Sequence, residues 1–179
     1  SNQIDSRGVV QEPIRIATAN GEIVVNIPKN TVALTAEGTP VKEITVRPLL
    51  VTPPAPTGLN VVGFATDFGP DGATFNPPID LTLKIDLTRI PAGVPAEQLV
   101  IAWFDVSRGS WVELEDSVVD LATGTVTARV SNFTAFAIIA RTATTATPFN
   151  IWVVIGPIIG LAVVGGLLYF FFRRRRKIA

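Results

Sequence analysis

The sequence predicts a mainly β protein, an antiparallel β-sandwich ectodomain followed by a single C-terminal transmembrane α-helix. About nine short runs rich in β-branched residues are separated by turn-forming residues, a spacing typical of sandwiches. No helical periodicity occurs before residue 150. The 22 residues Ile151–Phe172 then carry no charge, and five basic residues follow them directly.

The chain divides into five expected segments. Residues 1–12 are polar and irregular, and we expect an N-terminal arm that a partner orders. Residues 13–140 form the predicted sandwich, and residues 141–149 are a short polar tether. Residues 150–172 form the predicted helix, and residues 173–179 are a basic tail.

Each predicted strand rests on alternation and on the turns that bound it. Alternation is clearest over residues 81–86, where the leucines and Ile85 are expected to point inward. Asn20-Gly21 is a hairpin signal, and Pro48 marks the end of its strand as an edge or an exit. Residues 51–59 contain three prolines, and residues 68–78 are turn-rich and end in Pro77-Pro78, so both are expected loops. The predicted strands are 14–16, 22–27, 44–49, 61–66, 81–86, 99–105, 111–114, 125–130 and 133–139.

The uncharged segment near the C-terminus has the length of a membrane span. At 1.5 Å per residue it makes a helix of about 33 Å, against about 30 Å of hydrocarbon. Trp152 and Tyr169 suit the two membrane–water interfaces as anchors. A basic cluster next to a span marks the cytoplasmic side, so we expect a single-pass protein of the cell membrane in type I orientation, with an extracytoplasmic N-terminal domain. The cluster is Arg173, Arg174, Arg175, Arg176 and Lys177, which can also attract lipid headgroups.

Small residues recur along the predicted helix. Gly156 and Gly160 form a GxxxG pair, and Ala162 and Gly166 repeat the small-xxx-small spacing. Such residues let two helices approach closely, which favours docking against a second copy or another membrane subunit. The alternative explanation for these small residues is that glycine is common in membrane helices in general. The span has no ionisable side chain, so we expect an anchor and not a transporter.

The charge balance and the missing residue types exclude several function classes. The 15 basic and 15 acidic residues cancel, but five bases lie in the tail, which leaves 10 bases against 15 acids before it, a net charge of −5. An acidic ectodomain without a stripe of basic residues argues against nucleic acid as a binding partner. The absence of Cys and His removes disulfides, thiol chemistry, the commonest general base and the commonest metal ligand, so no cofactor is expected. No Met is present even at position 1, and we expect that a secretory signal peptide has been removed.

Two groups of carboxylates are weak candidates for chemistry. Asp67 and Asp71 flank a glycine-rich turn and could supply oxygens to calcium, although aspartates at turns more often cap the backbone. Glu113, Glu115 and Asp116 form an acidic run, which is more typical of a solvated face than of a hydrolase pair. No serine has a histidine partner, and we therefore expect no enzyme.

Three stretches together resemble a known family. They are residues 21–28, residues 68–78, and residues 111–114 leading to 130–137. Their order and spacing resemble the ZU-type β-sandwich domain of ankyrins and netrin receptors, and more closely its prokaryotic exported forms that precede a membrane anchor. The resemblance covers roughly residues 14–140 and implies a protein-interaction role, since the ankyrin domain of this kind binds spectrin.

Some relatives in that family cleave themselves at a His-Phe-Ser tripeptide. The matching residues here are Asn132, Phe133 and Thr134. Asn132 cannot accept the proton of the Thr134 hydroxyl, so we expect no cleavage and a core role for Phe133 and Phe136. The same three residues also match the N-glycosylation sequon, and the sequence leaves open whether Asn132 carries a glycan.

These observations predict a non-catalytic accessory or structural subunit of a larger membrane complex. Its partners would be other membrane-protein subunits, contacted through the ectodomain and the transmembrane helix, and the lipid bilayer. A free-standing surface or adhesion module tethered by its helix is the alternative. A self-cleaving domain is the third possibility.

Overall fold

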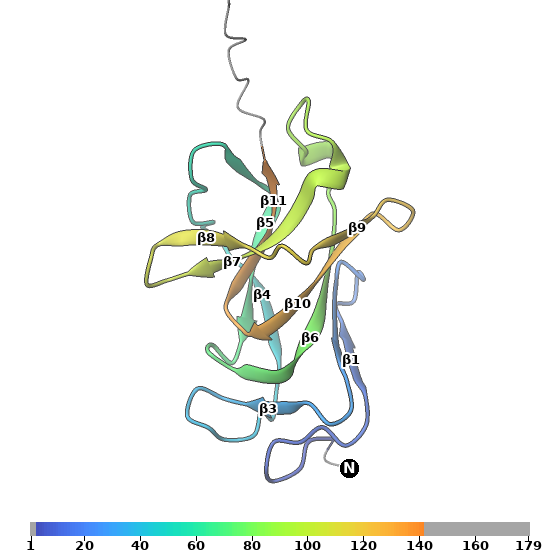
Figure 1. Ribbon diagram of the computed structural model, residues 1–179, viewed down its shortest axis with the longest axis vertical. Coiled ribbons are helices and arrows are strands. Elements are labelled where there is room, and N and C mark those ends of the chain that lie inside the picture. Colours follow the sequence, from blue (N-terminus) through green and yellow to red (C-terminus); the bar gives the residue numbers. More distant parts are fainter. Residues whose placement is uncertain (1–2, 142–179) are drawn as a thin grey trace, which may run out of the picture. The chain divides into compact units, whose positions relative to one another are not determined.

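A computed structural model describes residues 3–141, which belong to the first of two compact units, Ser1–Ala143 and Thr144–Ala179. Within the described part, eleven strands form two antiparallel sheets. Figure 1 shows how the strands are arranged in space. The predicted β fold is therefore confirmed. No helix in residues 3–141 is long and apolar enough to cross a bilayer. The predicted helix 150–172 lies outside the described residues.

The first sheet is built around one long strand, β6. It has six strands, and the short strand β3 pairs with the beginning of β6 while β2 pairs with its end. The order is β1 (Ile14–Ala17), β2 (Ile23–Ile27), β6 (Thr74–Lys84), β10 (Thr125–Asn132) and β9 (Val118–Asp120), with β3 (Val32–Leu34) off this path.

The second sheet is built around the last strand, β11. β11 lies between β5 and β7, and its last residue, Arg141, is paired with Leu59 at the start of β5. Two short 3₁₀ helices, η1 (Leu87–Arg89) and η2 (Ala96–Gln98), connect β6 to β7. The order is β4 (Thr45–Pro48), β5 (Leu59–Gly69), β11 (Ala135–Arg141), β7 (Leu99–Asp105) and β8 (Ser110–Glu113).

The main core lies between the two sheets. Alternate side chains of β6 and β10 point into it, as period-two alternation requires. Its centre is aromatic: the Phe133 ring centroid lies 4.6 Å from that of Phe75 and 5.6 Å from that of Phe68, which is also 5.6 Å from that of Phe136. Phe133 is fully buried and Phe136 nearly so, which confirms their predicted core role.

A second, smaller core covers the outer face of the second sheet. Six consecutive residues of β11 are buried, so this strand is covered on both faces. Ala137 and Ile139 pack outward with Trp111, and Leu49 and Ala55 of the proline-rich connection lie against them. The Trp111 indole Nε1 donates a hydrogen bond of 3.1 Å to the Pro53 carbonyl oxygen, which holds the connection in place.

The region 68–78 differs from the expected loop. Only the turn near Asp71 is irregular, and β6 runs through Pro77 and Pro78. Neither proline occupies a paired register position, because β3 is paired with β6 up to Asn76 and the pairing with β2 begins at Asp80. A proline is tolerated in a strand where no ladder hydrogen bond is required.

The expectation that residues 1–12 form an arm ordered by a partner is wrong for the part that the structure describes. Val10 is fully buried in the main core. Its backbone N–H donates to the Thr31 carbonyl at 2.9 Å, and the Ala33 N–H donates to the Gly8 carbonyl at 2.8 Å. Because Val9 forms a bridge to Val32, this segment extends the first sheet.

Candidate functional site

The residues predicted to act in the membrane all lie outside the described part of the chain. Their roles in helix packing, interfacial anchoring and topology therefore stay predictions. They are Gly156, Gly160, Ala162, Gly166, Trp152, Tyr169 and the basic cluster 173–177.

The two aspartates considered as calcium ligands have no third carboxylate beside them in the described residues. Asp67 lies on β5 opposite Ala135, and Asp71 is exposed in the turn between β5 and β6. Among residues 3–141, no group of three or more carboxylates gathers closely enough to hold a metal ion. The geometry of this turn thus gives no support to a cation site.

The acidic run at the end of β8 forms ion pairs with two arginines on other strands. Glu113 accepts from Arg141 Nε at 2.8 and 3.1 Å and also from its terminal nitrogen, while Asp116 accepts from Arg129 Nε at 3.3 Å. The hydrogen bond and charge of Glu113 raise the pKa of Arg141. Glu115 is exposed. These contacts are structural, and the first of them fixes the last described residue of β11 to β8.

The tripeptide that resembles a self-cleavage site lies at the junction of β10 and β11. The Thr134 hydroxyl donates to the Phe104 carbonyl oxygen at 3.2 Å, and the residue is only 8% exposed. The backbone N–H of Phe133 donates to the Ala73 carbonyl at 2.8 Å. These two hydrogen bonds fix Phe133 and Thr134 in place, and the Phe133 ring lies in the aromatic core.

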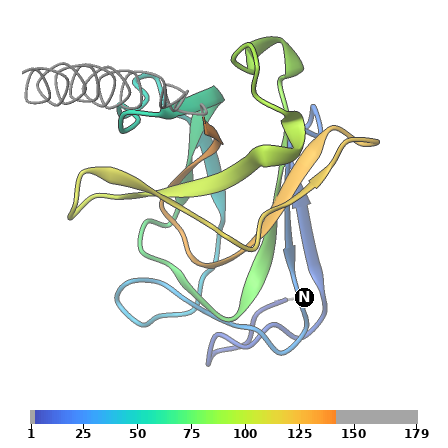
Figure 2. The ribbon, with the colours of Figure 1, turned by 45° about the horizontal axis from the view of Figure 1, so that its top comes forward.

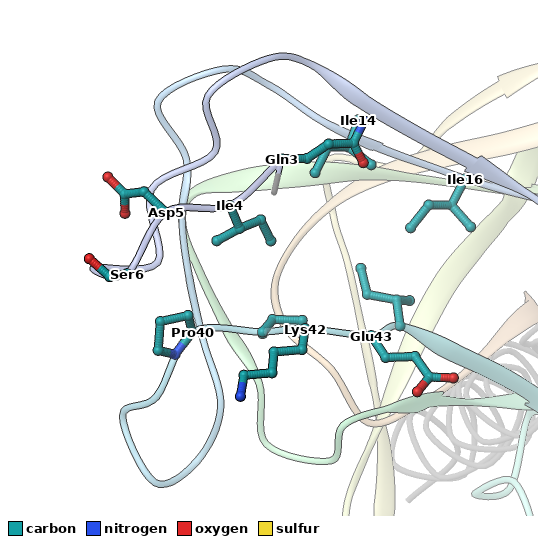
Figure 3. A pocket seen from close by; sticks show the side chains of 11 residues that line it. Gln3, Ile4, Asp5, Ser6, Ile14, Ile16, Pro40, Lys42 and Glu43 are labelled. Carbon is teal, nitrogen blue, oxygen red and sulfur yellow. The ribbon is translucent and has the colours of Figure 1, made fainter. Parts of the chain in front are cut away.

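Two hollows lie on the side of the sandwich where each sheet ends in an edge strand, β1 in the first sheet and β4 in the second. We call them together the lateral groove. Figure 3 shows the first hollow, of about 540 Å³, where Ile14 and Ile16 of β1 face the segment that leads into β4. Lys42, Glu43 and Asp5 lie at its rim, and hydrogen bonds from the backbone N–H groups of Val9 and Arg7 lower the pKa of Asp5.

The second hollow, of about 690 Å³, opens toward the main core. Its floor includes Val62 and Ile138, which are almost fully buried. Phe64 stands at its wall with 64% of its surface exposed, and the Arg89 guanidinium carbon lies 4.5 Å from the ring centroid. A hydrogen bond from the Thr88 hydroxyl is the main cause of the lowered pKa of Asp86 at the rim.

The chemistry of the lateral groove is that of binding. Its walls combine apolar side chains with polar and charged ones, and the two carboxylates whose pKa values are lowered, Asp5 and Asp86, stay ionised at neutral pH and can only accept hydrogen bonds. Arg15 on β1 and Arg47 on β4 are exposed on the edge strands, where charges oppose uncontrolled strand pairing. Sequence reasoning placed an edge near Pro48, which the structure confirms, but it did not find the groove, because β1 and β4 are far apart in the chain.

Comparison with known proteins adds no relative to this description. No family model matches the chain, and no curated protein matches it either. The molecule is therefore defined by its fold and its surfaces: an antiparallel two-sheet β domain with a lateral groove of mixed apolar and polar lining.

Proposed function

We propose that this protein is a membrane-anchored, extracytoplasmic and non-catalytic accessory or structural subunit of a larger membrane complex. The β domain would stand on the outer side of the cell membrane, and residues 150–172 would cross it. The resemblance to the ZU-type domain, carried by the residues at 21–28, 68–78, and 111–114 leading to 130–137, supports a role in protein interaction.

The observation that carries this proposal is the way the chain leaves the domain. β11 is the central strand of its sheet and is buried on both faces, and it ends at Arg141, which Glu113 holds. The uncharged segment Ile151–Phe172 begins ten residues later in the sequence. An anchor that follows this strand would be joined directly to the core of the β domain, which suits a structural subunit.

The lateral groove supports a contact with exposed parts of partner subunits. It lies beside two edge strands, and a partner segment that enters it would bury the half-exposed isoleucines of β1 and meet the charged side chains Lys42 and Glu43. Concave surfaces that combine apolar contacts with polar groups able to fix orientation are the usual form of binding sites.

The test is extraction of native membranes with a mild detergent, followed by size fractionation and mass spectrometry of the proteins that travel with this chain. Stoichiometric co-migration with other membrane subunits is expected. Migration alone, at the mass of a monomer or dimer, would contradict the proposal and favour the tethered surface module.

A pair of variants tests the predicted helix contact. Gly160→Leu places a large side chain in the GxxxG pair and should abolish co-migration while the chain stays in the membrane. Val154→Leu enlarges a residue that belongs to neither small-residue pair and should have no effect. Equal behaviour of the two variants would assign the helix to anchoring alone.

A further inference from the structure

Two neighbouring apolar side chains stand out on the surface. Leu50 is 99% exposed and Val51 is 82% exposed, more than any other large apolar side chain among the described residues. Isolated exposed apolar residues are common. An adjacent pair with almost no contact to the rest of the domain is a candidate for an interaction.

The connection that carries this pair is held on both sides. The Leu49 N–H donates to the Ala65 carbonyl at 2.8 Å, and the Leu59 N–H donates to the Pro56 carbonyl at 3.0 Å. Between these bonds, the Trp111 indole holds Pro53. Three prolines further restrict the backbone. Leu50 and Val51 therefore lie on a segment that is tied to the domain at Leu49 and Pro53, and both side chains are exposed.

The same connection adjoins the place where the chain leaves the domain. It ends at Leu59, which is paired with Arg141, the last described residue of β11. Figures 1 and 2 show the segment before β5 at the end of the domain where β11 finishes. Residues 142–149 can span no more than about 29 Å even when fully extended. A bilayer that holds residues 150–172 would therefore lie within about 29 Å of Arg141.

We propose that Leu50 and Val51 insert into the outer leaflet of the membrane, at the boundary between headgroups and acyl chains. This inference rests on the proposed membrane anchor. Shallow burial of apolar side chains in this zone is the ordinary mode of interfacial attachment. With the anchor, it gives the domain two points of attachment and so fixes its tilt and the direction in which the lateral groove faces.

The test uses the full-length chain, which contains no cysteine, so that each introduced cysteine is labelled uniquely. Leu50→Cys carries the polarity-sensitive fluorophore NBD, and the protein is reconstituted into phosphatidylcholine vesicles. The expected result is a blue shift of the emission, quenching by doxyl-labelled lipids, and loss of quenching by aqueous iodide. Because the contact is apolar, the result should not require anionic lipid.

Two further positions make the outcome decisive. Val118→Cys, 67% exposed on the edge strand β9, should remain accessible to iodide. Val163→Cys lies in the predicted span and should be deeply buried. If position 163 is buried while position 50 behaves like position 118, the inference is overturned and the anchor stands. If position 163 is not buried, the proposed anchor itself fails. Protection of position 50 only in native membranes would overturn lipid contact and assign the pair to a protein partner.

Discussion

Phe133 shows how one side chain joins the two sheets. It belongs to the junction between β10 of the first sheet and β11 of the second, and its ring contacts Phe75 on β6 and Phe68 on β5. Close-packed interiors relax only partly when such a ring is removed, so a cavity remains.

Phe133→Ala should therefore lower the free energy of unfolding by about 3–5 kcal/mol. Urea unfolding of the full-length protein in mild detergent, followed by tryptophan fluorescence, measures this change. Phe64→Ala is the matched control: Phe64 is 64% exposed, and its loss should cost only about 1 kcal/mol, mainly the contact with Arg89. Similar losses for both variants would contradict the role of Phe133 as the centre of the core.

Gly8 explains why the N-terminal segment can dock so closely. Its φ of +84° is in the region that favours glycine, and an added Cβ would lie 2.6 Å from Leu34 Cδ2 and 2.9 Å from the Ala33 carbonyl oxygen. The Leu34 side chain can move, but the backbone oxygen cannot move without breaking the bridge between Val9 and Val32.

Gly8→Ala should release residues 3–12 from the domain and cost about 1–3 kcal/mol. Hydrogen exchange measures the effect, with faster exchange expected at the Ala33 and Val10 amides, which bond this segment to the domain. Gly38→Ala is the control, because φ there is +76° and no atom lies within 4 Å of the added Cβ. It should cost only the backbone strain, about 1–2 kcal/mol, and leave exchange in the N-terminal segment unchanged.

At the scale of elements, the proline-rich connection acts as a cover for β11. An antiparallel sheet commonly exposes one face to water, but here the outer face of the second sheet is apolar around Ala137 and Ile139. The Trp111 hydrogen bond to Pro53 is what ties the cover to β8.

Trp111→Phe should keep most of the apolar contact and lose this hydrogen bond, at a cost of about 1 kcal/mol. We expect faster hydrogen exchange at the amides of Leu49 and Leu59, which lie at the two ends of the connection between β4 and β5. Trp103→Phe serves as the control, since Trp103 packs against the main core on the other side of the sheet. Unchanged exchange in Trp111→Phe would show that apolar packing alone holds the cover.

At the scale of the whole molecule, aspartates at turns set the response to acid. The pKa values of Asp5, Asp86, Asp105 and Asp120 all lie below the ordinary value of 3.8. A hydrogen bond from the Ser107 hydroxyl is the main cause at Asp105, followed by the backbone N–H groups and the charge of Arg108. Folding thus favours the ionised form of each group.

The stability should therefore fall in acid. A carboxylate whose folded pKa is lowered contributes its full stabilisation above its unfolded value, near 3.8, and loses it as the pH falls through the folded value. The urea midpoint should be nearly flat from neutral pH down to about pH 5 and then decrease below about pH 4. Asp105→Asn removes one titrating group and should show a smaller decrease over the same range; an identical decrease would mean that Asp105 does not contribute.

Several elements were predictable because their causes are local. Residues 99–105 form a strand as expected, and Asn20-Gly21 lies in the turn between β1 and β2, with Gly21 at a φ of +69°. Period-two alternation and the backbone freedom of glycine act within a few residues, so a single sequence reveals them. The acidic run near Glu113 was predicted to be a solvated face, which holds for the exposed Glu115, whereas Glu113 and Asp116 bind arginines on other strands that the sequence did not reveal.

Other features depend on pairing between distant parts of the chain. Pro77 and Pro78 read locally as the end of a loop, yet they lie inside β6 because the neighbours of that strand change there. The strands β3 and β9 are only three residues long and are strands because longer strands pair with them.

The sequence by itself determined the β class, most strand positions and the uncharged segment that we expect to cross the membrane. Those properties follow from local hydrophobic patterns and from chain length. Only the tertiary structure decided that Val10 belongs to the core, that β1 and β4 border a groove, and that Leu50 and Val51 are exposed near the exit of the chain. Burial and exposure depend on which distant residues cover a side chain, and no local pattern contains that information.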